Sequence, residues 1–320
     1  MTRHPVREGW MMLKRGLALL LLLVCISGYA LSEEVPPFGD FSDVFADKFL
    51  APGSAPVQEP LFYQSENIRI EITPIRRQKT DIYVADIYVR STEHFQRAFS
   101  QGKWRKPAEK VADMAQEHQA VLAMTGDNGH NLATGWVVGN GVYWRQTKSV
   151  KRDMCILYRS GVMETIELQQ VDNDLLREKA ARQEFWHCFL FGPALLDAQG
   201  KAKMTFNSTV NPANPRSAIG YYEPGHYCFV QIDGRGAPSK LEPGKKSTGL
   251  RLNELSLFME ELGCTAAYNL DGGQSSMLYF DGAVLSSPYK NGRKTGDIVL
   301  IRELETPEAL PLDLSDEEEK

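Results

Sequence analysis

The sequence predicts an α+β fold, in which one mixed α/β domain has a largely β-sheet core and flanking helices. Strand-like patterns of apolar residues occur at 67–73 and 81–90, and 227–232 is a further apolar strand. Such patterns are typical of half-buried strands. Helical spacing of apolar residues occurs in fewer places. The 320 residues exceed the usual size of a single domain and fit one large domain with appendages.

Residues 1–30 have the order of a secretory signal peptide. Four basic residues precede the uncharged run from Gly16 to Ile26, and Gly28-Tyr29-Ala30 supplies the small residues of a cleavage site. The apolar run is short for a membrane span. The protein is therefore expected to be secreted or extracytoplasmic in the cell envelope, and membrane-bound only if the leader stays uncleaved as an anchor.

The net charge of the chain argues against nucleic acid as a partner. The formal net charge is −5, and without residues 1–30 it would be −8, from 32 basic and 40 acidic residues. An acidic chain gives no electrostatic basis for binding nucleic acid. Residues 303–320 are acidic and contain proline, so a disordered tail is expected there.

The remaining domain boundaries follow from composition. Residues 31–60 are rich in Pro, Ala, Glu and Asp and predict a linker, in which the segment 38–50 packs on the domain. The main domain then spans 61–302 and opens with a hairpin formed by 67–73 and 81–90. Further strands are expected at 120–124, 142–145, 154–158, 162–168, 184–191, 266–268, 277–280 and 297–302. Helices are expected at 107–118, at 172–181 and after Ser247-Thr248-Gly249, up to Gly263.

Four cysteines follow the leader, namely Cys155, Cys188, Cys228 and Cys264. An even number in an exported protein permits two disulfides in three connectivities. Each cysteine also lies in an apolar setting, which favours buried free thiols. No C-x-x-C pattern is present, so no zinc site is expected.

The stretch from Asn269 to Met277 is the first candidate for a functional site. A carboxylate, two glycines and two hydroxyls follow an apolar strand-like run there. Glycine allows main-chain N–H groups to approach a ligand, although Asp-Gly is also the commonest hairpin signal. A second polar, glycine-rich loop, 125–131, follows another expected strand. Arg216 is expected in the loop 211–220, which contains Pro212 and Pro215. Its guanidinium could bind phosphate through two parallel hydrogen bonds, or it could form a surface salt bridge.

Four separated stretches together resemble the phosphodiester glycosidase family. They are Thr125-Gly-Asp-Asn-Gly129, Asn214-Pro-Arg-Ser-Ala-Ile-Gly220, Asp233-Gly-Arg235 with Ser247-Thr-Gly249, and Asn269-Leu-Asp-Gly-Gly-Gln-Ser-Ser276. The similarity covers about 67–302. It departs from the family pattern at Thr125, where Asn is usual, and at Ser217, where Thr is usual.

The resemblance implies hydrolysis of a sugar 1-phosphodiester to free sugar and a phosphomonoester. It implies a catalytic set of Asp271, Asp127, Asp233 and Arg216. It also implies a substrate-binding set of Arg235, Gly272, Gly273, Ser275, Ser276, Asn128, Thr125, Ser247 and Gly249. The expected partner is a sugar phosphate or a cell-wall or capsular glycan. No cofactor is expected, although a single divalent cation such as calcium would suit the aspartates.

The residue types fit this chemistry on their own account. Phosphate is a good leaving group, so stabilising its charge with arginine and N–H groups matters more than protonating it. The anomeric carbon gains oxocarbenium character, which requires a carboxylate close by. Asp271 ranks first for that role, then Asp127, then Asp233. Two alternatives remain at this stage: a non-catalytic module that binds phosphoglycans, and a metal-dependent phosphodiesterase.

Overall fold

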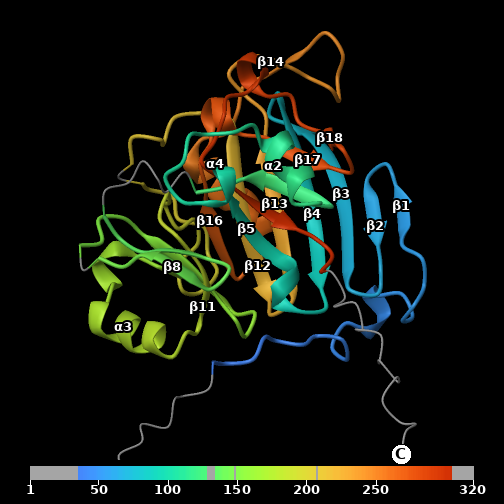
Figure 1. The fold of residues 1–320 in the computed structure, drawn as a ribbon. Coiled ribbons are helices and arrows are strands. Elements are labelled where there is room, and N and C mark those ends of the chain that lie inside the picture. The colour runs from blue at the N-terminus through green and yellow to red at the C-terminus, as the bar shows by residue number, and fades with distance from the viewer. Residues whose placement is uncertain (1–34, 128–133, 148, 207, 305–320) are drawn as a thin grey trace, which may run out of the picture. The chain divides into compact units, whose positions relative to one another are not determined.

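The computed structural model describes residues 35–304, apart from 128–133, 148 and 207 (Figure 1). By its internal contacts the chain divides into two units, 1–35 and 36–320, and every element described here belongs to the second. The expected leader at 1–30 and all but the first two residues of the expected tail lie outside the described residues.

A seven-stranded antiparallel sheet is the largest element of the fold (Figure 1). Its strands, in spatial order, are β1 (Val57–Glu59), β2 (Phe62–Gln64), β3 (Ile68–Arg77), β4 (Thr80–Val89), β13 (His226–Ile232), β12 (Arg216–Glu223) and β16 (Ala266–Asn269). Strands β3 and β4 form the expected hairpin, with Ile68 opposite Val89. Ile68, Ile70 and Ile72 are buried on one face, as their spacing predicts.

Two five-stranded antiparallel sheets complete the β-structure. The first contains β10 (Met163–Ile166), β9 (Met154–Tyr158), β11 (Phe185–Phe189), β7 (Val137–Gly139) and β8 (Val142–Arg145). The second contains β18 (Ala283–Val284), β17 (Leu278–Phe280), β6 (Leu122–Thr125), β19 (Asp297–Ile301) and β5 (Phe95–Phe99). A short ribbon pairs β14 (Ala237–Pro238) with β15 (Lys246–Ser247).

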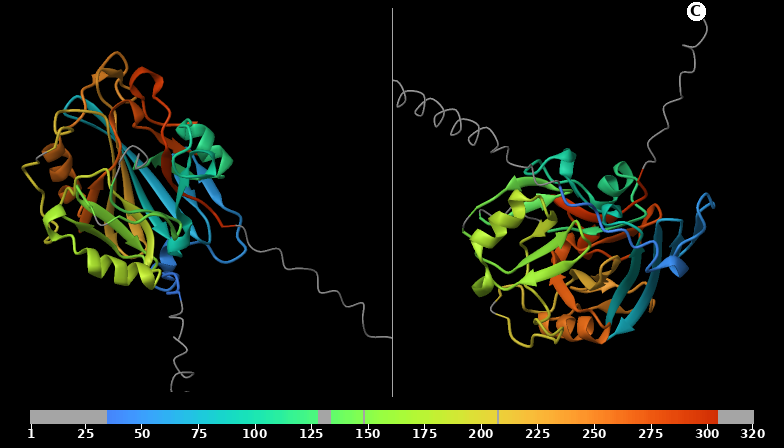
Figure 2. Two further views of the ribbon diagram at one scale, coloured as in Figure 1. Left: turned by 60° about the vertical axis from the view of Figure 1, so that its left-hand side comes forward. Right: turned by 90° about the horizontal axis from the view of Figure 1, so that it is seen from below.

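The main hydrophobic core lies between the large sheet and both smaller ones. Ile70 and Phe229 of the large sheet share a cluster with Leu157 of the first five-stranded sheet and Val299 of the second. Figure 2 shows the green strands β7–β11 set against the cyan and orange strands of the large sheet. Since each sheet buries a face against another, the predicted α+β class with a largely β-sheet core is confirmed.

Three α-helices of the described residues cover the outer faces of the sheets. They are α2 (Val111–Glu117), α3 (Asn173–Ala181) and α4 (Leu252–Glu261). Helix α4 buries Leu252, Leu255 and Phe258 in a second cluster that contains Val230 of the large sheet. Short 3₁₀ turns occur at Ala46–Lys48, Thr92–His94, Ser100–Gly102, Leu168–Gln170, Gly273–Ser275 and Tyr289–Asn291. No described helix is long and apolar enough to cross a membrane.

The structure differs most clearly from the sequence predictions at β12 and α2. Strand β12 lies between β13 and β16 in the large sheet, where a loop was expected at 211–220. Its small residues Ser217, Ala218 and Gly220 fit between these two flanking strands. Helix α2 begins at Val111 and not near Pro107, because Glu109 is extended and pairs with Thr295.

The appendages and cysteines can also be placed. In the expected linker, Phe41 and Phe45 are buried, and Val57–Glu59 forms the edge strand β1. Glu303, at the start of the expected tail, accepts hydrogen bonds from Tyr63, Ser65 and Asn67. All four described cysteines are buried free thiols, and the Sγ atoms of Cys228 and Cys264 lie 3.7 Å apart.

A fully buried arginine on β5 connects the two five-stranded sheets. Arg97 donates from Nη1 to the carbonyls of Val138 on β7 (3.2 Å) and Cys188 on β11 (2.9 Å). Its Nε and Nη2 contact Oδ2 of Asp297 on β19 at 2.8 and 2.7 Å, and Nη2 lies 3.5 Å from Oδ2 of Asp127. One side chain therefore joins both sheets to the loop that follows β6.

We expect Arg97→Met to lower the free energy of unfolding by about 3–5 kcal/mol, because it leaves two buried carboxylates without their cation. Urea denaturation followed by circular dichroism measures the change. Arg177→Met is the matched control, since it breaks an exposed pair with Asp174 and should change stability little. Equal stability losses in the two variants would contradict the structural role of Arg97.

Candidate functional site

Three strands of the large sheet, β12, β13 and β16, have ends that lie side by side, and the candidate loops are attached to these ends. In antiparallel neighbours, the start of one strand lies beside the end of the next. Arg216 at the start of β12 pairs with Ile232 at the end of β13, and Ala218 pairs with Asn269 at the end of β16. The loops 211–215, 233–236 and 270–275 therefore leave the sheet together.

These loops surround a cavity of about 220 Å³, here called the arginine cavity. Among the described residues it is lined by one carboxylate, three arginines and a group of neutral residues. The lining residues are Asp271, Arg216, Arg235, Arg293, Phe191, Val210, Asn214, Gly272, Gly273 and Gln274. Of the residues implied by the family resemblance, Arg216, Arg235, Asp271, Gly272 and Gly273 meet here.

Asp271 is held in place by the main chain on both sides. Its N–H donates to the carbonyl of Gly126 (3.0 Å), and its Oδ1 accepts from the N–H of Gly272 (2.9 Å). The side chain is almost completely buried, and burial raises the pKa of this carboxyl. The Ser275 hydroxyl, Arg293 and the Gly272 N–H act in the opposite direction on that pKa. Asp271 thus faces the cavity from a fixed position.

Arg293 is a site residue that the sequence analysis missed. Its Nη2 lies 3.4 Å from Oδ2 of Asp271, and its Nε donates to Oγ of Ser275 at 2.6 Å. Half of the Arg293 side chain is exposed. In the sequence, nothing distinguishes Arg293 from its basic neighbours Lys290 and Lys294. Its place is revealed by these two contacts and by its N–H, which donates to the carbonyl of Gln274 (3.1 Å).

Arg216 lines the cavity from β12, although it does not present the expected bidentate fork. Its Nε donates to the carbonyl of Leu250 (3.1 Å), and its Nη2 contacts the carbonyls of Val210 (2.6 Å), Asn211 (3.3 Å) and Pro212 (2.7 Å). Two of its three nitrogens are therefore engaged by the protein itself. Burial lowers the pKa of Arg216 to about 10, so the side chain remains a cation at neutral pH.

Arg235 lies opposite and is exposed. Its Nε donates to Oδ1 of Asn214 (2.8 Å), and its guanidinium packs over Gly273, where an added Cβ would be 3.2 Å from Nη1. Arg235 itself has φ 54°, an uncommon conformation for a residue other than glycine. Arg235 thus adds an exposed cation to the cavity lining.

Close backbone approach explains two of the implied glycines. A Cβ at Gly272 would lie 2.6 Å from the carbonyl oxygen of Pro215, which also accepts the N–H of Gly273 at 2.9 Å. Gly249 has φ +91°, and a Cβ there would lie 2.5 Å from the backbone of Asn214. Gly272 is part of the cavity lining, whereas Gly249 lies outside it and packs against the backbone of Asn214, which is part of the lining.

Asp127 lies beneath the cavity and is fully buried, so it is not among the lining residues. Its carboxylate accepts from the N–H groups of Leu190 (2.8 Å to Oδ1) and Phe191 (2.6 Å). Burial raises the pKa of Asp127, against the effect of Arg97. In this structure its role is to position Phe191, which lines the cavity.

Asp233 also lies outside the lining and anchors a neighbouring loop. Both its oxygens accept from the N–H of Ser287, at 3.0 and 2.9 Å, and its own N–H donates to the carbonyl of Asp81. Burial raises the pKa of Asp233 to about 7, to which the negative charge of Asp81 contributes. The geometry therefore gives no contact through which Asp233 could reach a ligand in the arginine cavity.

The implied hydroxyl residues support the loops without lining the cavity. Thr125 donates to the carbonyl of Ser275 (2.5 Å) and accepts from the N–H of Met277 (3.1 Å). Ser276 bonds Ser217 (3.1 Å), and Ser247 accepts from the N–H of Asp81 (3.1 Å). Ser275 reaches the site indirectly, through Asp271 and Arg293. Asn128 lies outside the described residues.

The described residues contain no group of three or more His, Cys, Asp or Glu side chains placed to hold a metal ion. Asp271 is the one carboxylate that meets the cavity within this part of the chain.

We expect the stability of Asp233→Asn relative to wild type to rise between about pH 4 and pH 7. The folded-state pKa lies above the unfolded value of about 3.9, so the contribution of Asp233 is complete at low pH and is lost as pH rises through 7. Asparagine stays neutral and removes this dependence. Urea unfolding across pH 4–8 tests it, with exposed Asp281→Asn as control. A constant stability difference over that range would contradict the assignment.

Comparisons with known proteins identify the family of the chain. Residues 115–302, more than half of the chain, match the phosphodiester glycosidase family. The uncharacterized protein YomE of the SPbeta prophage of Bacillus subtilis (strain 168) is 29% identical over 187 residues, which cover 56% of this chain and 27% of that protein. The chain therefore spans about a quarter of that relative's length.

Two solved structures share the fold. One is the zebrafish N-acetylglucosamine-1-phosphodiester alpha-N-acetylglucosaminidase catalytic domain, auto-inhibited by its pro-peptide, with TM-score 0.57 and 15% identity over 77% of this chain and 85% of that chain. The other is a hypothetical protein from Synechocystis, with TM-score 0.54 and 14% identity over 79% and 64% of the two chains. With the sequence match over 115–302, these findings establish that the chain belongs to the phosphodiester glycosidase family.

Proposed function

We propose that this protein hydrolyses the glycosidic C–O bond of sugar 1-phosphodiesters. The observation that carries the proposal is the meeting of one carboxylate, Asp271, with Arg216, Arg235 and Arg293 around a single cavity. A carboxylate suits an anomeric carbon that becomes cationic, and guanidinium groups suit the phosphate that departs from it. The family to which the chain belongs supports the same reaction class.

In the proposed reaction the bond between the anomeric carbon and the phosphate oxygen breaks. The electron pair leaves with the phosphate oxygen, and the oxygen of a water molecule becomes bonded to the anomeric carbon. Asp271 acts either as the nucleophile that water later displaces or as the base that takes a proton from water. In both roles it must be ionised, which its contacts with Arg293, Ser275 and the Gly272 N–H favour.

Hydrolysis in oxygen-18 water tests the reaction class. The protein is incubated with a panel of sugar 1-phosphodiesters, and the products are identified by mass. Label in the sugar is the expected result. Label in the phosphate would mean P–O cleavage and would favour a metal-dependent phosphodiesterase, while binding without turnover would favour a phosphoglycan-binding module of the cell envelope.

Export belongs to the same proposal, since the expected substrates are cell-wall or capsular glycans. The leader at 1–30 supports it. The intact mass of the exported protein should correspond to a chain that begins at Leu31. Recovery of the full-length chain from the membrane fraction would instead indicate an anchor.

Asp271→Asn should lower kcat/KM for a sugar 1-phosphodiester by about 10²–10⁴-fold, because the amide can serve neither as nucleophile nor as base. The fold should persist, since the Gly272 N–H can still donate to the amide oxygen. Steady-state release of free sugar measures the loss. Asp281→Asn, which removes an exposed carboxylate outside the cavity lining, is the control. Turnover by Asp271→Asn at the wild-type rate would remove Asp271 from the mechanism.

Arg293→Gln should lower kcat/KM about tenfold and move the acidic limb of its pH profile to higher pH. The limb moves because Arg293 lowers the pKa of Asp271, so its loss raises that pKa. Arg235→Gln is the control: it removes a cation of the same cavity that does not contact Asp271, and should raise KM without moving the limb. An unmoved limb in Arg293→Gln would separate Arg293 from the ionisation of Asp271.

A further inference from the structure

A second cavity adjoins the arginine cavity and shares Arg293 with it. Its volume is about 570 Å³, and we call it the lysine cavity because Lys110, Lys240 and Lys294 line it together with Arg293. Its described lining contains no aspartate or glutamate. The whole chain carries a formal charge of −5, so this local excess of cations runs against the average.

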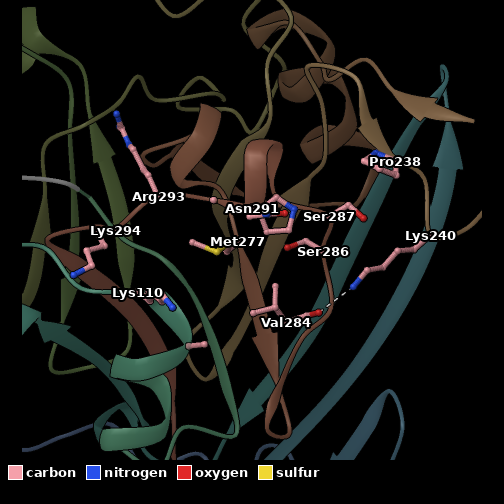
Figure 3. A pocket seen from close by; sticks show the side chains of 13 residues that line it. Lys110, Pro238, Lys240, Met277, Val284, Ser286, Ser287, Asn291, Arg293 and Lys294 are labelled. Atoms are coloured by element: carbon pink, nitrogen blue, oxygen red, sulfur yellow. Dashed lines mark hydrogen bonds between the residues drawn. The ribbon is translucent and has the colours of Figure 1, made fainter.

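The lysines come from separate parts of the chain. Figure 3 shows Lys110 and Lys294 on one side of the cavity and Lys240 on the other, with Met277 and Ser286 between them. The antiparallel bridge between Glu109 and Thr295 places Lys110 beside Lys294. Like charges side by side repel one another. Their placement next to the candidate site is therefore explained better by an anionic ligand than by stability.

The cations of the lysine cavity differ in whether they already interact with other groups of the protein. Lys240 donates from Nζ to the carbonyl of Val284 at 3.0 Å and faces the buried Asp233, whose pKa it lowers. Arg293 turns its guanidinium away from the centre of the cavity (Figure 3), toward Asp271 and Ser275. Lys110 and Lys294 are both exposed and are the cations that remain for a ligand.

A third cavity also adjoins the arginine cavity. It shares Phe191 and Val210 with the arginine cavity and has a mixed lining, in which Lys203 lies 3.0 Å from Glu167. Its charges are thus partly compensated within the protein. Its described lining has three cations, Lys151, Arg152 and Lys203, against two carboxylates, Asp153 and Glu167, whereas that of the lysine cavity has four cations and no carboxylate. The more anionic end of a substrate should therefore lie in the lysine cavity.

We propose that the lysine cavity is the subsite for the leaving-group side of the substrate, and that this side carries a second phosphate beyond the scissile phosphodiester. This inference rests on the proposed function and adds the substrate class, a phosphate-rich glycan or sugar-phosphate polymer. The scissile phosphodiester has one negative charge, and the arginine cavity, with three arginines against Asp271, already supplies more positive charge than that group requires. Lys110 and Lys294 lie beyond that group and match the next anion along the chain.

Two synthetic ligands test the proposal: N-acetylglucosamine 1-phosphoglycerol, and the same compound with a further phosphate on the glycerol. Calorimetry with the full-length Asp271→Asn protein gives both Kd values without turnover. We expect the extra phosphate to tighten binding about tenfold at low salt, and less at high salt. Adding Lys110→Gln and Lys294→Gln should abolish that gain and leave the Kd of the shorter ligand unchanged.

The control carries Lys245→Gln and Lys246→Gln, which remove the same charge from exposed positions outside the cavity lining, and should retain the gain. The proposal is overturned if the extra phosphate brings no gain, if the gain survives loss of Lys110 and Lys294, or if the control abolishes it equally. Because this readout needs no hydrolysis, failure of the proposed reaction would appear separately, as absence of turnover by the wild-type protein.

Discussion

The buried guanidinium of Arg97 is the constraint on which the site depends. A cation without exposure must find a partner for each of its N–H groups, because an unpaired buried charge is very costly. Arg97 meets this need with carbonyls of one five-stranded sheet and carboxylates attached to the other. Asp127, held in this cluster, binds the N–H groups of Leu190 and Phe191 and so fixes one wall of the arginine cavity.

The aspartates of these loops divide into those that support the loops and one that lines the cavity. Asp127 binds the N–H groups that follow β11, Asp233 binds the N–H of Ser287, and Asp81 binds those of Lys240 and Leu241. Each of these carboxylates accepts hydrogen bonds from loop N–H groups that have no partner in a neighbouring strand and would otherwise need water. Asp271 alone among them also has a side open to the cavity. Aspartate thus supplies both the supports of these loops and the one carboxylate that lines the cavity among the described residues.

The sequence predicts the regular parts of the fold well and the site only in part. Strands such as β3 and β4 alternate clearly, and their pairing follows from a short turn. Strand β12 was missed because Pro215 precedes it and small residues fill it, and β5 because a buried Arg97 resembles a surface residue. The sequence identified the loop of Asp271, but which aspartate meets the cavity depends on long-range contacts. Arg293 could not be separated from neighbouring basic residues for the same reason.

The placement of the cations bears on catalysis as well as on binding. In the proposed reaction the phosphate begins with one negative charge as a diester and gains a second as C–O cleavage proceeds. Arginines around the cavity therefore interact more strongly with the departing group than with the bound substrate, which is the condition for lowering the barrier. The same increase in charge would hold the product. Arg235 is exposed and half of the Arg293 side chain is in solvent, so water weakens their hold on the phosphomonoester and allows it to leave.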